Sequence, residues 1–228
     1  MRPRAPCVAG IFYPASESAL RDELRRLLAG ARRPLDGEVR GGLVPHAGYA
    51  YSGRVAAAFF ASVPAAPETV VFCASVHLPG VTTAALCARG AWSVPLGDVA
   101  VDEELAREIL RAGSGVVEEN EAAHRGDHAI EVQLPFVVER WPSARFVPMV
   151  VPADGRAIGL GSAIGAAART AGRSVLAVAS SDLTHYGARY GFAPYGAGPD
   201  ALARAHGVND AALLERVARL DGTGVLEE

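Results

Sequence analysis

Short apolar runs alternate along the chain with longer stretches in which apolar residues recur at helical spacing. The apolar runs that predict buried strands are residues 39–44, 69–74, 81–88, 145–151 and 174–179. Strands that alternate with helices are typical of a largely parallel sheet with helices packed on both faces. We therefore predict an α/β fold built on a central, largely parallel or mixed sheet.

The segments between these runs predict the helices. Leucines recur at helical spacing from Ser16, a suitable N-cap, to about residue 28. Further helices are predicted at residues 53–63, 102–112, 128–140 and 156–170, and in a last segment that Asn209 caps. Pro135 is expected to kink or break the helix that contains it. Residues 118–127 are predicted as a polar loop, and the Gly/Tyr/Pro-rich residues 186–199 as an active-site loop.

Length and composition narrow the class of protein. The 228 residues are 50% apolar and 21% charged, which favours one globular domain over residues 1–228. The net charge of -3 argues against a nucleic-acid partner, which needs a basic surface. We expect no membrane span, because no apolar run reaches the length of about 18 residues that a spanning helix requires.

The cysteines and the N-terminal residues indicate the cellular compartment in which the protein is expected. The three cysteines are widely spaced and odd in number, which argues against a disulfide framework. The first residues lead into no long apolar stretch of the kind found in signal peptides. We expect a reducing, cytoplasmic location.

Three of the predicted strands lead into histidine. His46 and His77 each follow an apolar run, and Asp182 and His185 follow another. The carboxyl ends of parallel strands meet at one edge of an α/β sheet, where such proteins bind their ligands. Imidazole is the commonest metal ligand near neutral pH, and two histidines with one anionic ligand are the arrangement of non-haem Fe(II) oxygenases. We expect one shared site, in which Asp182 and His185 are ligands, an acid/base pair or groups that orient a ligand.

A second cluster of titratable residues lies between the predicted strands. His124, Asp127, His128 and Glu131 fall within eight positions. One interpretation is a catalytic or pocket-lining edge, with His128 at the start of a helix. The alternative is a capped helix N-terminus, where Asp127 offsets the helix dipole. The sequence leaves both interpretations open.

Two tyrosines follow the first histidine. Tyr49 and Tyr51 are candidates to line a substrate pocket, with the phenol as hydrogen-bond donor or acid. The alternative for both is aromatic packing against the edge of the sheet.

Four segments, in order along the chain, resemble the Memo family, whose bacterial members are called AmmeMemoRadiSam system protein B. They are residues 8–14 (VAGIFYP), 45–53 (PHAGYAYSG), 128–136 (HAIEVQLPF) and 180–187 (SSDLTHYG). The resemblance implies a fold similar to the class III extradiol dioxygenases. It also implies metal ligands at His46 and His77, with Asp182 and His185 close by in the pocket.

The chain departs from the family pattern at two places. The family usually has Gly-Pro-Ser/Asn-His at the second strand end, where residues 74–77 read ASVH. The resemblance places the remaining metal ligand in a C-terminal Cys-Gly segment, and residues 1–228 contain none. We therefore expect a single Memo-like domain that lacks the C-terminal part usual in the family.

The resemblance and the histidine edges suggest a metal-dependent oxidoreductase with a dioxygenase-like pocket. The expected cofactor is a divalent metal, with iron first and copper or zinc as alternatives. His128, His185 and Asp182 are the expected catalytic residues, and Tyr49, Tyr51 and Glu131 the expected substrate-binding residues.

Two other functions stay open. One is a protein that binds a small molecule or peptide in the same pocket without turnover, as animal members of the family are thought to bind phosphotyrosine peptides. The other is a zinc hydrolase that uses metal-activated water. The family name further implies a functional association with a radical-SAM protein.

Overall fold

The centre of the protein is a six-stranded mixed sheet. The computed structural model describes residues 2–31 and 37–227, and the strand order is β1-β8-β2-β7-β3-β6. The strands are β1 (Gly41–Val44), β8 (Val175–Ser180), β2 (Thr69–Ala74), β7 (Arg145–Val150), β3 (Ala84–Leu86) and β6 (Val117–Glu119). All neighbouring strands run parallel except β3 and β7, which are antiparallel. The predicted α/β class is confirmed.

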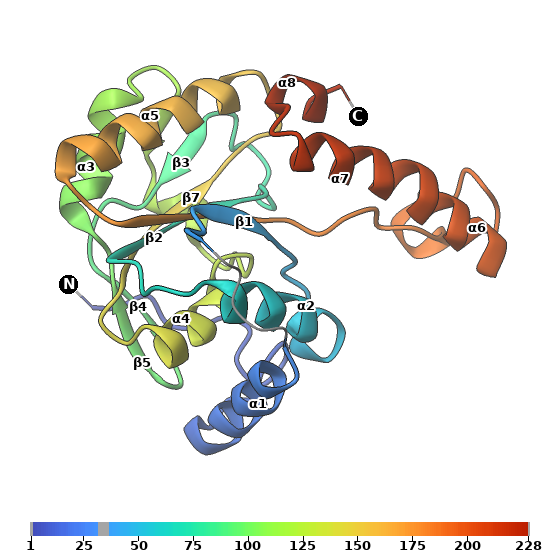
Figure 1. The fold of residues 1–228 in the computed structure, drawn as a ribbon, viewed down its shortest axis with the longest axis horizontal. Coiled ribbons are helices and arrows are strands. Elements are labelled where there is room, and N and C mark those ends of the chain that lie inside the picture. Colours follow the sequence, from blue (N-terminus) through green and yellow to red (C-terminus); the bar gives the residue numbers. More distant parts are fainter. Residues whose placement is uncertain (1, 32–36, 228) are drawn as a thin grey trace.

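Helices cover both faces of this sheet (Figure 1). On one face α3 (Glu103–Ala112) packs against α5 (Arg156–Ala171). On the other face lie α1 (Glu17–Ala29), α2 (Tyr49–Ser62) and α4 (Leu134–Arg140), which contact one another. The central strands β2 and β7 are almost entirely buried, as expected for strands covered on both faces.

Two glycines let β1 approach its neighbours closely. A Cβ atom on Gly41 would overlap the Ala177 carbonyl of β8, and one on Gly42 would overlap the Phe59 ring of α2. A strand of larger residues would have to move away from both elements. The glycines therefore hold β1, and the loop that follows it, against the rest of the sheet.

Several element boundaries differ from those predicted. The α2 helix begins at Tyr49 rather than residue 53, and β3 is three residues long rather than eight. The predicted polar loop 118–127 contains the end of β6 and a short 3-10 turn. Its residues pair with β3 although their sequence is polar, because β6 is an edge strand with one hydrogen-bonded neighbour.

One hairpin has no counterpart in the prediction. The strands β4 (Ala91–Val94) and β5 (Gly97–Ala100) form a separate two-stranded sheet. Each strand has only four residues, which is too short for a clear alternation of apolar and polar positions. The short length explains why the sequence pattern missed it.

Pro135 marks a break in the predicted helix 128–140, one of the two roles expected for it, and does not kink a continuous helix. The helix α4 begins at Leu134, after a 3-10 turn at Glu131–Gln133, and not at His128. Pro135 lies in the first turn of α4, where no backbone N–H is needed, so it starts the helix instead of kinking it. His128 therefore lies in irregular backbone ahead of the helix.

The C-terminal residues form a helical arm (Figure 1). The helices α6 (Pro199–Ala205) and α7 (Ala211–Ala218) are joined by a π-helical stretch, and α8 (Gly222–Val225) follows. Asn209 lies inside this continuous helical stretch, so the prediction that it caps the last helix is wrong. None of the helices in residues 2–31 and 37–227 is long and apolar enough to cross a membrane.

Candidate metal centre

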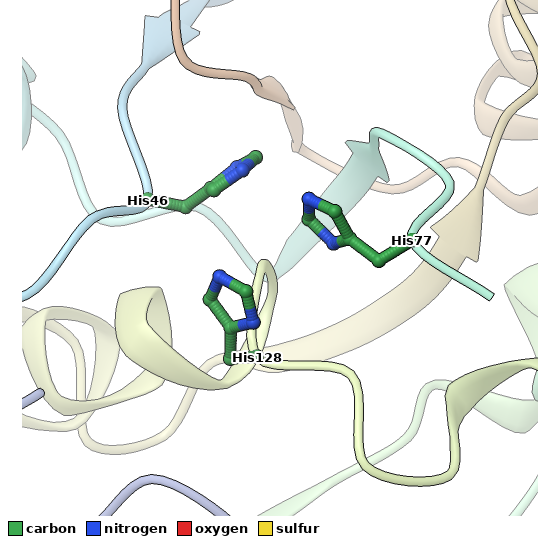
Figure 2. Close-up of side chains that lie close together, drawn as sticks. All are labelled: His46, His77 and His128. Atoms are coloured by element: carbon green, nitrogen blue, oxygen red, sulfur yellow. The ribbon is translucent and has the colours of Figure 1, made fainter. Parts of the chain in front are cut away.

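Three histidines meet at the edge of the sheet where β1 and β2 end. His46 follows β1, His77 follows β2, and His128 comes from the segment before α4; their rings point toward a common space (Figure 2). One ring nitrogen from each histidine can be chosen so that all three lie within 4.8 Å of one another. The ring centres are 5.0 Å apart for His46 and His77, and 4.9 Å apart for His77 and His128.

Burial keeps two of these rings neutral at pH 7. His46 is only 2% exposed, and burial lowers its pKa below the ordinary value, partly offset by the charge of Asp182. Burial also lowers the pKa of His128, and the neighbouring His77 lowers it further. Neutral imidazoles keep the lone pairs that a metal needs. His77 is the exposed member of the group, so the centre is accessible from solvent on that side.

A buried carboxylate orients His77. Asp127 is 3% exposed, and its Oδ2 atom lies 3.0 Å from Nδ1 of His77. Its other oxygen accepts a hydrogen bond of 2.8 Å from the backbone N–H of Ala129. A carboxylate oxygen accepts hydrogen bonds, so this contact favours the His77 tautomer with its proton on Nδ1, which leaves Nε2 for a metal. Carboxylates behind metal-ligating histidines commonly have this role.

His46 is held by both its backbone and its ring. The backbone N–H donates to Oδ1 of Asp182 over 2.8 Å, and ring Nδ1 lies 3.3 Å from Oγ of Ser180. The His128 ring has a different support, an edge contact with the Phe12 ring at 4.8 Å. Three imidazoles suit iron, copper or zinc and leave coordination positions free for a further ligand. The residues present therefore fit a divalent transition metal.

Asp182 and His185 lie next to this centre but are not part of the three-histidine group. Nε2 of His185 is 3.4 Å from Oδ2 of Asp182, and the His185 ring stacks on Tyr190 at 4.9 Å. Both residues line a largely apolar groove of about 510 Å³ between the end of β1, α2 and α7. Their predicted catalytic roles stay predictions.

The two tyrosines have contrasting positions. Tyr49 is buried, packs on Phe136 and donates a hydrogen bond of 2.8 Å to the backbone carbonyl of Val132. Tyr51 is 88% exposed and lines the same groove as Asp182 and His185. Ligand binding stays a prediction for both tyrosines, and Tyr51 is the one whose ring is accessible.

Glu131 anchors the N-terminal segment. It is fully buried, and its two oxygens accept five hydrogen bonds, from Arg4, from the Cys7 backbone and thiol, from Val8 and from Tyr13. Burial alone would raise the pKa of this carboxyl, but the hydrogen bonds outweigh it and lower the pKa. The structure gives Glu131 a structural task, and its expected contact with substrate stays a prediction.

His124 does not join the centre. It is 1% exposed, its ring packs edge-on against Trp92, and burial lowers its pKa to about 4. Of the four titratable residues that the sequence groups together, only Asp127 and His128 contribute to the three-histidine site.

Sequence reasoning missed Ser180 and Gln133, which lie behind His46. The signal for Ser180 is its position at the end of β8, where it pairs with Val44 at the end of β1. That signal can be used only when the strand order is known. Gln133 lies in a recognised motif, but the motif does not indicate which atoms it contacts.

Fold and site together define an α/β protein with a candidate three-histidine metal centre at the carboxyl edge of its sheet. Comparison with known protein families matches residues 4–228 to the family described as Memo-like protein. The chain belongs to this family.

Archaeal proteins are among its relatives. The MEMO1 family protein TK1477 of Thermococcus kodakarensis is 34% identical over 233 residues, which cover 99% of this chain and 80% of the relative. The MEMO1 family protein MTH_45 of Methanothermobacter thermautotrophicus is also 34% identical, over 97% of this chain and 79% of the relative. A MEMO1 family protein of Methanococcoides burtonii is 38% identical over 80% of this chain and 68% of the relative.

Proposed function

We propose that this protein binds a divalent transition metal at His46, His77 and His128 and uses it for oxidation chemistry in a dioxygenase-like pocket. The observation that carries the proposal is the convergence of three ring nitrogens within 4.8 Å. Iron is the first candidate, and copper or zinc are the alternatives, because imidazole suits all three. A bound redox-active ion supplies electron transfer and Lewis acidity to a substrate at its open positions.

The protein's own residues support this use in three ways. The low pKa values of His46 and His128 keep them neutral, so protons do not compete with a metal at pH 7. Asp127 fixes the orientation of His77. The exposed side of His77 leaves a path for ligand and metal to enter.

Metal analysis of untagged protein tests the proposal. The full chain is loaded anaerobically with equimolar Fe(II), Cu(II) and Zn(II), desalted, and analysed by mass spectrometry for bound metal. We expect about one ion per chain in the wild type, and a loss of on the order of tenfold or more in His46→Ala and His77→Ala. The mass spectrum identifies the bound element, and electron paramagnetic resonance after mild oxidation detects Cu(II) or Fe(III), because Fe(II) and Zn(II) give no conventional signal.

His206→Ala is the matched control. His206 also has an aspartate partner, Asp210 at 3.2 Å, but its side chain is 77% exposed and it lies on the helical arm. This variant is expected to retain metal at the wild-type level. Equal metal content in wild type and His46→Ala would sink the proposal, as would an equal loss in His206→Ala.

A second candidate function is ligand binding without turnover. The groove lined by Tyr51, Asp182 and His185 favours it, because this groove is largely apolar with a few polar groups. A small molecule or peptide is the proposed occupant, and a radical-SAM protein is the proposed functional partner on the basis of the family resemblance. Capture of small molecules by Tyr51→Ala at the wild-type level would argue against the groove as the binding surface.

A further inference from the structure

Behind His46 lies a chain of buried hydrogen bonds. The chemistry of the groups alone determines which atom donates and which accepts in each bond. It begins at Gln133, which is 1% exposed and has Nε2 at 2.8 Å from the backbone carbonyl of Pro45. A carbonyl oxygen can only accept a hydrogen bond. The amide nitrogen of Gln133 must therefore face Pro45, because the reversed amide would bring two oxygens together at this distance.

The next residue in this chain of hydrogen bonds is Ser180, which is fully buried at the end of β8. Its Oγ atom lies 2.7 Å from the Ala129 carbonyl, 3.3 Å from Nε2 of Gln133 and 3.3 Å from Nδ1 of His46. A hydroxyl has one proton and two lone pairs. The Ser180 hydroxyl donates its hydrogen bond to the Ala129 carbonyl, and one of its lone pairs accepts the hydrogen bond from the Gln133 N–H.

One lone pair of Ser180 remains, and the His46 ring faces it. The Nδ1 atom must therefore be the donor in this contact, which means that it carries the ring proton.

We infer that Ser180 and Gln133 are positioning residues that hold His46 in its Nδ1–H tautomer and so leave the Nε2 lone pair free. Asp127 favours the same Nδ1–H tautomer in His77, so two rings of the centre are oriented by different partners. The consequence for metal affinity rests on the proposed function. The tautomer itself does not, because it is set by the protein alone.

Imidazole nitrogen spectra test the tautomer directly. Full-length protein is labelled with ¹⁵N-histidine, freed of metal with chelator, and studied by long-range ¹H–¹⁵N correlation at pH 7.5. We expect a protonated Nδ1 and a bare Nε2 for His46 in the wild type. In Ser180→Ala the His46 signals should move toward the Nε2–H pattern, while Ser180→Thr, which keeps the hydroxyl, should restore the wild-type pattern.

Ser181→Ala is the matched control. Ser181 is the next residue, and its hydroxyl contacts Ser75 and the Asp182 carbonyl rather than a histidine. This variant should leave the His46 spectrum unchanged. Zinc affinity, measured by chelator competition, should fall about 10- to 100-fold in Ser180→Ala and stay at the wild-type level in Ser181→Ala. Thermal unfolding of each variant verifies that it is folded.

The outcomes separate this inference from the proposed function. A wild-type His46 protonated on Nε2 would overturn the inference whether or not metal binds. An unchanged Nδ1–H pattern in Ser180→Ala would show that the Ser180 hydroxyl does not set the tautomer, and would overturn its role as the positioning side chain. The inferred tautomer in a protein that retains no metal would leave the inference standing and refute the metal proposal.

Discussion

The three-histidine centre and the Asp182–His185 pair occupy the same edge of the sheet but differ in how their rings are supported. At the centre, buried groups contact the rings of His46 and His77 from behind. The His185 ring is instead 56% exposed, has one 3.4 Å contact with Asp182 and stacks on Tyr190. Position at a strand end brings a histidine to the site, but the groups behind the ring determine whether it is prepared as a ligand.

The largest expected effect concerns His128, which the sequence places in an acid/base role and the structure places among the potential ligands. His128→Ala should weaken zinc and iron affinity by on the order of 100-fold, because removal of a ligand costs at least as much as loss of its supporting group. Chelator competition measures the affinity. If this variant bound metal with wild-type affinity, His128 would not be a ligand. An acid/base role would then remain for it, and the centre would have two ligands.

The second prediction compares the two aspartates of this edge. Asp127→Asn removes the charge behind His77 and should weaken metal affinity about 10-fold or more. Asp182→Asn is the comparison and should cost less, because Asp182 contacts the His46 backbone and the exposed His185 ring rather than a buried ring nitrogen. A larger loss in Asp182→Asn than in Asp127→Asn would show that Asp182 belongs to the metal centre.

Part of this site could be predicted from the sequence, and part could not. The ends of β1, β2 and β8 were predictable, because their apolar runs are long and each leads into polar residues. The contact between Ser180 and His46 was not predictable, since it depends on β8 lying next to β1. Strand order arises from packing of the whole sheet, which no local pattern encodes.

The same limit explains the second cluster of titratable residues. The sequence is compatible with either a catalytic edge or a helix cap at residues 124–131. In the structure these residues have different roles. His128 and Asp127 join the centre, whereas Glu131 binds the N-terminal segment. The predicted helix start at His128 is wrong, because the helix begins only at Leu134.

The third prediction concerns pH. Burial lowers the pKa values of His46 and His128 below the ordinary 6.5, so both rings stay neutral until the pH falls below that value. Zinc affinity should therefore be nearly constant from pH 8 to 7 and should fall by up to about tenfold per pH unit for each ring that gains a proton. The stability contributed by the neutral buried rings has the same sign: it is present above the unfolded-state pKa and is lost as the pH falls.

Chelator competition across pH 8 to 5 measures this dependence. A steep loss of affinity already between pH 8 and 7 would contradict the prediction, because it requires rings that are protonated near neutrality. Such a result would mean that the pKa values of the rings are raised above the ordinary 6.5 instead of lowered by burial.

The smallest expected effect belongs to His185. His185→Ala should leave metal affinity at the wild-type level and lower the free energy of unfolding by less than about 1 kcal/mol, because an exposed ring with one long contact contributes little. Competition titration and urea unfolding measure the two quantities, with His206→Ala as the comparison for an exposed histidine beside an aspartate. If His185→Ala lost metal while His206→Ala did not, the His185 ring would have to move toward the centre when metal binds. The two regions would then act as one site, as the sequence pattern alone suggests.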